Sequence, residues 1–196
     1  MAFPDIEPNG VTITNETPTV INTARSGRQT RFQRSDPALT IAYEYNALSE
    51  SERRSIIGHH ASVGGSLNSF DVNLPTGIKD NSASYTGTLT TNGAHTAGDT
   101  TIAVNGSTNG LCLKAGDYIR FASGSNKLYT ITADASVSAG TTTLQIFPAL
   151  LDDVTTGVTV NHTDVTAKVF YQTVELGYRM GPNLFGDITV TFKEDL

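Results

Sequence analysis

The feature that most restricts the fold is an alternation over positions 39–46, in which every second residue is large and apolar. These residues are Leu39, Ile41, Tyr43 and Tyr45, and the other face carries Thr40, Ala42, Glu44 and Asn46. A half-buried β-strand requires this period of two, because successive side chains point to opposite faces. The alternation recurs at 69–74 and 187–193. Thr, the commonest residue type, favours strands, and the eighteen glycines favour turns, so the sequence predicts a mainly β fold.

Residues 49–63 carry the pattern typical of a helix. Ser49 and Glu52 match the S-x-x-E capping box, in which a hydroxyl and a carboxylate satisfy backbone donors that the first turn leaves free. The expected inner stripe consists of Ile56, Ile57, His60 and Val63. Gly64 and Gly65 are typical of a helix C-terminus.

A change of composition divides the chain. Residues 80–165 are rich in Thr, Gly, Ser, Asn and Ala and contain several short strand patterns, whereas the flanking segments carry the helix and the clearer alternation. We therefore expect an N-terminal arm over 1–18 and one β domain, a barrel or sandwich, built from 19–79 and 166–196. Residues 80–165 would be inserted into that domain as a second small β-barrel or sandwich.

Two finer expectations concern the outer domain. A hairpin loop at 179–183 would join the last two strands, because Gly181 and Pro182 favour a turn. The strand at 39–46 and the last strand are candidates for exposed sheet edges, which a monomer must protect from pairing with other chains.

Composition and charge exclude several classes of protein. A net charge of −6 argues against attraction of the whole surface to nucleic acid or anionic lipid. No apolar run is long enough to span a membrane, and the N-terminal residues do not resemble a signal peptide. A single cysteine, Cys112, excludes an intramolecular disulfide and a zinc site built on cysteines.

Four arginines form the one cluster of charge: Arg25, Arg28, Arg31 and Arg34. They lie on an expected hairpin that turns at Ser26-Gly27. On regular strands, Arg28 and Arg34 would face one side and Arg25 and Arg31 the other, so a single basic stripe is not expected. A solvated hairpin and a contact surface for partners are both consistent with this pattern.

The remaining candidates favour structural roles. His59 and His60 lie about 100° apart on a helix and cannot share one metal ion, so we expect one inward and one surface histidine. Cys112 lies between leucines with no base in its vicinity, which favours burial. The Asp152-Asp153 and Glu194-Asp195 pairs are expected to be solvated charges. No motif of a nucleophilic, phosphate-binding or metal-dependent enzyme is present, so no catalytic residue, metal site or cofactor is predicted.

The outer segments resemble the minor tail and distal tail proteins of long-tailed bacteriophages. The stretches that carry this resemblance are residues 17–20, TARSGRQTRFQR, LTIAYEYN, SESERRSIIGHHASVGG, SFDVNLP, residues 174–177 and ITVTF. The inserted segment, with LKAGDYIRFAS, KLYTITAD and GTTTLQIFPAL, is similar to β insertions in some tail-tip proteins of this group.

The resemblance implies that residues 19–79 and 166–196 form a tube-like β domain of the kind used in tail tubes. It also implies a non-catalytic structural protein of the virion, assembled in the host cytoplasm. Its partners would be copies of itself in a ring, commonly a hexamer, together with the tail tube and the tail-tip or baseplate proteins. Genome DNA would be passing cargo, and no membrane is implied. Within such a ring, the arginine hairpin is expected to contact acidic surfaces of neighbouring subunits rather than DNA, because strong phosphate binding would impede ejection of the genome.

Two alternatives stay open at this point. The insert is a candidate carbohydrate-binding module for host attachment, with Tyr85, Tyr118 and Tyr129 as the rings that would stack on sugars, unless they belong to the core. The chain is also a candidate for another ring protein of the tail, such as a tail terminator or tube-end adaptor.

Overall fold

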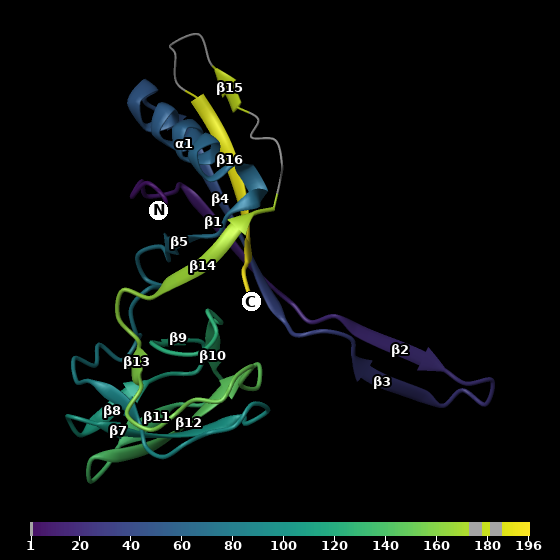
Figure 1. Cartoon of the computed structure of the whole chain (residues 1–196), viewed down its shortest axis with the longest axis vertical. Coiled ribbons are helices and arrows are strands. Elements are labelled where there is room, and N and C mark those ends of the chain that lie inside the picture. Colours follow the sequence, from purple (N-terminus) through teal and green to yellow (C-terminus); the bar gives the residue numbers. More distant parts are fainter. Residues whose placement is uncertain (1, 173–177, 181–185) are drawn as a thin grey trace.

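The computed structural model describes residues 2–172, 178–180 and 186–196. They form an open β-sheet covered by a helix, a closed β-barrel and a hairpin that projects away from both (Figure 1). The mainly β fold with one α-helix in the described residues, and a barrel inserted into the sheet unit, confirms the predicted fold class. The chain leaves the sheet after β5 (Phe70–Asn73), builds the barrel and returns at β14 (Thr166–Tyr171).

The sheet has the order β1-β4-β16-β14-β5 and is antiparallel throughout. Its other strands are β1 (Gly10–Glu16), β4 (Ala38–Leu48), β16 (Gly186–Glu194) and the short β15 (Tyr178–Met180), which pairs with β16. The predicted alternation decides which face is buried, since Ile41, Tyr43 and Tyr45 all point into the core. In register with them, Phe192 lies opposite Ile41 and Val190 opposite Tyr43.

Helix α1 (Glu50–Val63) covers the buried face of this sheet and begins where the capping box predicts. Ser49 is the N-cap, and its backbone N–H donates to the Glu52 carboxylate at 2.9 Å. Gly64 ends the helix in the left-handed region, with φ of 73°. A short 3₁₀ turn, η1 (Gly65–Leu67), follows.

One histidine expectation is wrong in its detail. His59, not His60, faces the core with Ile56 and Val63, while Ile57 and His60 are half-buried. The spacing of three and four residues along Ile56, His59 and Val63 places these side chains on one stripe of the helix. The His59 Nδ1 atom lies 2.9 Å from the Tyr171 hydroxyl, and its ring packs edge-on to Phe70.

The N-terminal residues belong to the sheet unit rather than to a free arm. Strand β1 pairs with β4 along its whole length. Phe3 is buried, and its backbone N–H donates to the backbone carbonyl of Asp71, a residue of β5, at 3.0 Å. The segment between them carries the chain from one edge of the sheet to the other. The expectation of edge strands at 39–46 and at the C-terminus is also wrong, because β4 and β16 lie inside the sheet and β1 and β5 form its edges.

The barrel lies within residues 80–165 and closes in the order β10-β12-β7-β6-β13-β9. Its strands are β6 (Leu89–Thr91), β7 (Thr101–Gly106), β9 (Tyr118–Phe121), β10 (Tyr129–Ile131), β12 (Thr141–Phe147) and β13 (Thr159–Asn161). The pair β8 (Gly110–Leu113) and β11 (Ala135–Val137) adds side chains to the same core. The sheet and the barrel thus have separate hydrophobic cores.

The predicted loop at 179–183 is only partly described. Residues 179 and 180 belong to strand β15 instead of a loop. Residues 181–183 of that loop, and residues 174–177 of the resemblance, lie outside the described residues.

Candidate functional site

The projecting hairpin consists of β2 (Thr19–Thr23) and β3 (Gln29–Gln33). We call residues 19–34 the arm. In the described part of the chain these two strands pair only with each other, and Figure 1 shows the arm extending away from the sheet and the barrel. Apart from the half-buried Val20, every arm residue is exposed. Both faces of the arm are therefore available for contact with another molecule.

Local sequence explains why the arm is a hairpin that does not pack on the body. The Ala24 N–H donates to the Arg28 carbonyl at 2.9 Å, and Gly27, with φ of 81°, supplies the left-handed residue of the turn. Phe32 lies opposite Val20 on one face, whereas Ile21 lies opposite Arg31 on the other. With apolar side chains divided between both faces, neither face can join a one-sided core.

All four predicted contact residues, Arg25, Arg28, Arg31 and Arg34, are exposed on this arm. Among the described residues no carboxylate lies within ion-pair distance of them, and Arg31 donates only to Gln29 Oε1, at 3.3 Å. The arm also exposes Ile21 at 56% and Phe32 at 53%. Guanidinium groups beside exposed apolar side chains are a common composition for protein interfaces.

A buried ion pair joins the barrel to the sheet close to the arm. Lys127, in the loop between β9 and β10, contacts Glu194 at the end of β16, and both side chains are 1% exposed. The Glu194 carboxylate also accepts the Leu128 N–H at 2.6 Å and the Leu39 N–H at 3.0 Å. Burial lowers the pKa of Lys127, and the charge of Glu194 opposes that shift.

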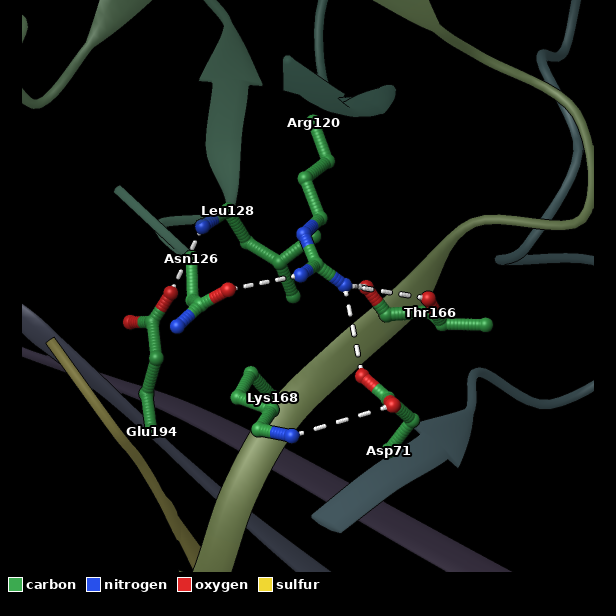
Figure 2. Close-up of polar contacts among 7 residues, drawn as sticks. All are labelled: Asp71, Arg120, Asn126, Leu128, Thr166, Lys168 and Glu194. Carbon is green, nitrogen blue, oxygen red and sulfur yellow. Dashed lines mark hydrogen bonds and ion pairs between the residues drawn. The ribbon is translucent and has the colours of Figure 1, made fainter. Parts of the chain in front are cut away.

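Arg120 of the barrel makes a second set of contacts with the sheet (Figure 2). Its guanidinium lies 3.5 Å from the Asp71 carboxylate and 3.2 Å from the Thr166 hydroxyl, and it donates to Asn126 Oδ1 at 2.8 Å. Lys168 approaches the other Asp71 oxygen at 3.8 Å. We call these residues, with Lys127, Leu128 and Glu194, the interdomain joint. Figure 2 draws all of these residues except Lys127, and they come from both units, so the joint fixes the barrel against the sheet.

The sequence did not predict this joint. Glu194 was expected to be a solvated charge near the chain end, but the whole residue, backbone included, is only 3% exposed. Glu194 is in phase with the buried Ile188, Val190 and Phe192 of β16, so the alternation itself indicated the buried face. The alternation does not indicate the partner, because Lys127 is 67 residues distant in the chain.

The three tyrosines that were candidates for sugar contact are buried or half-buried. Tyr85 and Tyr129 are 6% and 1% exposed, and the Tyr85 hydroxyl donates to the Thr108 carbonyl at 2.8 Å. Tyr118 is half-buried against the core of the sheet unit. A ring that stacks on a sugar must offer a face to solvent, so Tyr85 and Tyr129 serve the barrel core instead.

Cys112 and the histidines have structural surroundings. The Cys112 thiol is buried and donates to the Ala135 carbonyl at 3.2 Å, and burial raises its pKa. His162 is buried between Asn81 and the Gly87 carbonyl, and burial lowers its pKa. Within the described ranges no three metal-ligating side chains gather, and no helix has the length and apolarity to cross a membrane.

Comparison of the sequence with protein-family models finds no match, and comparison with curated proteins finds no relative.

Proposed function

We propose that this chain is a non-enzymatic structural subunit of a bacteriophage tail. It would form a ring, with a hexamer as the expected symmetry, at the distal tail, tail tip or baseplate. Its partners would be copies of itself, the tail tube and the proteins of the tip, with genome DNA passing through. The resemblance of the outer segments to minor and distal tail proteins motivates this proposal.

The exposed arm is the observation that carries the proposal. An isolated two-stranded hairpin is marginally stable in water, and this one adds two exposed large apolar side chains. Such an element gains stability when another surface covers it. The four arginines of the arm leave a net charge of −10 on the remainder of the chain, so identical copies are electrostatically complementary partners.

The oligomeric state of the purified chain tests this proposal. Analytical ultracentrifugation and electron microscopy of negatively stained particles should show a ring that grows in population with protein concentration. A variant with residues 19–34 replaced by a short Gly-Ser turn should lose the ring and keep the far-ultraviolet circular dichroism of β structure. A strict monomer at all concentrations that never joins a tail particle would contradict the proposal.

The position of the ring along the tail is a separate question. A tail terminator or tube-end adaptor uses the same kind of assembly with other partners. Labelling the chain in intact particles and locating the label by electron microscopy distinguishes these positions from the distal tip.

A further inference from the structure

A hollow of about 340 Å³ lies where the arm leaves the sheet. Apolar side chains line part of it, namely Ala38, Phe170 and Leu196, of which Leu196 is 52% exposed. The other lining residues are four acidic ones and one basic one, together with Pro18 and Ser35; the charged residues are Glu16, Asp36, Lys193, Glu194 and Asp195. The hollow thus combines an apolar surface with negative charge, the complement of what the arm carries.

The carboxylates of the hollow are only partly neutralised within the chain. Lys193 pairs with Glu16 at 2.9 Å. Asp36 and Asp195 have no cation within ion-pair distance among the described residues. Asp36 is exposed, and Asp195 is half-buried. The hollow therefore retains negative charge available to a basic partner.

We propose that this hollow receives the arm of a second copy of the chain. Arg28 and Arg34 lie on the same face of the arm as Phe32 and would pair with Asp36 and Asp195, while Phe32 covers Phe170 and Leu196. The arm of the same copy does not fill the hollow: no residue of β2 or β3 lines it, and the arm extends away from the sheet (Figure 1). This inference rests on the proposed assembly and names the surface through which it forms.

The geometry also determines the type of assembly. The arm and the hollow are different surfaces of one protomer, so the contact between two copies is head-to-tail rather than two-fold symmetric. Each copy offers one arm and one hollow, and every arm finds a hollow only when the chain of contacts closes into a ring. A series that does not close grows as a filament.

Disulfide trapping between two variants tests the contact directly. Phe32→Cys on the arm and Leu196→Cys in the hollow both replace exposed side chains. Mild oxidation of the mixture should give a mixed dimer in at least about tenfold higher yield than Phe32→Cys mixed with Ser51→Cys, an exposed control site on α1. The native Cys112 does not compete, because it is buried. Equal yields from both mixtures would overturn the inference.

Charge exchange provides an independent test in solution. Arg28→Glu/Arg34→Glu and Asp36→Arg/Asp195→Arg should each weaken self-association about tenfold, because like charges then meet across the contact. An equimolar mixture should restore association, since each altered arm then meets an altered hollow and each native arm a native hollow. Failure of the mixture to recover, with both variants folded by circular dichroism, would contradict the docking.

Two outcomes separate this inference from the proposed function. If wild-type rings form and both double variants keep them, the ring stands and the docking site is wrong. If the wild type is a monomer at every concentration, both fail. Binding of a double-stranded DNA oligonucleotide is measured in parallel, because arginine variants that lose DNA affinity but keep their oligomeric state would assign the arm to nucleic acid and overturn the docking.

Discussion

Glu194 connects three parts of the chain through one carboxylate. It contacts the Lys127 ammonium and accepts backbone N–H groups from Leu128 and Leu39. These partners belong to the barrel and to the strand that returns from the arm. A buried charge with three donors is satisfied as long as all of them are present, and removal of the charge leaves Lys127 buried without a counterion.

Replacement of Glu194 should therefore be costly. Glu194→Gln keeps the size but removes the charge and replaces one of the two acceptor oxygens with an amide donor, and we expect a loss of about 3–5 kcal/mol in the free energy of unfolding. Denaturant unfolding measures this loss. The control is Glu50→Gln on α1, which breaks an exposed pair with Arg54 and should change stability by less than about 0.5 kcal/mol. Equal effects of the two variants would show that the buried pair contributes no more than a surface pair.

Two glycines differ in whether the surrounding structure has room for an added methyl group. Gly58 is in the interior of α1, and a Cβ there meets nothing within 4 Å. Gly58→Ala should stabilise the protein by about 0.5–1 kcal/mol through helix propensity. Gly106 ends β7, and a Cβ there meets Val137 Cγ2 at 2.5 Å, so Gly106→Ala should lower the melting temperature. A stabilising Gly106→Ala would contradict the close packing of the barrel.

At the element scale, α1 and the arm show two ways in which local sequence sets a structure. The helix has a capping box at one end, a glycine at the other and one apolar stripe, so it packs on the sheet. The arm has a well-defined turn and regular pairing, but its apolar side chains are divided between two faces. Both elements form locally, and only the helix has a one-sided face that a core can cover.

The capping box should make part of the stability depend on pH. Hydrogen bonds from Ser49 lower the pKa of Glu52 below its ordinary value of 4.5. A lowered folded-state pKa stabilises the fold above the unfolded value, and this contribution is lost as pH falls through the folded value. We expect the free energy of unfolding of wild type to fall more steeply below pH 4.5 than that of Glu52→Gln.

Measurement of unfolding between pH 3 and pH 7 checks this difference. Ser49→Ala, which removes the side-chain acceptor of the cap, should lower stability by about 1 kcal/mol at pH 7. Parallel pH profiles of wild type and Glu52→Gln would show that the carboxylate does not act through the cap.

At the scale of the whole molecule, two cores are held together by polar contacts and by Leu128 and Tyr118, which pack on the core of the sheet unit. The sheet unit and the barrel each have their own hydrophobic cluster, and the interdomain joint links them through Lys127–Glu194 and Arg120–Asp71. Cooperative unfolding of two cores requires a strong contact between them. Here the chain also passes twice between the units, which keeps them adjacent even when the contacts are lost.

Loss of the joint should uncouple the two units. We expect Arg120→Ala/Glu194→Gln to unfold in two separate calorimetric transitions, where wild type unfolds in one. Arg54→Ala, which removes only an exposed pair, serves as the control and should keep a single transition. A single transition in the joint variant, merely shifted to lower temperature, would indicate coupling through other contacts.

Local patterns were sufficient for the elements but not for their neighbours. The alternation at 39–46 correctly indicates which side chains of β4 are buried, yet β4 was expected at an edge and lies inside the sheet. Residues 10–16 were expected in the N-terminal arm over 1–18, but they form an edge strand of the sheet. The segment that projects from the body is the hairpin at 19–34. The period of the apolar residues in a strand indicates which face is buried, but it does not indicate which strand lies beside it.

The sequence by itself determined the β class, the helix with both its ends, the arginine hairpin and the charge difference between that hairpin and the rest. Each of these depends on residues close together in the chain, through turn conformation, capping or period. Only the tertiary structure decided that Glu194 is buried with Lys127, that Tyr85 and Tyr129 belong to a core, and that a hollow lies at the root of the arm. Those features need contacts between residues far apart in the chain, such as Lys127 and Glu194, and this contact exists only once the barrel and the sheet have folded and met.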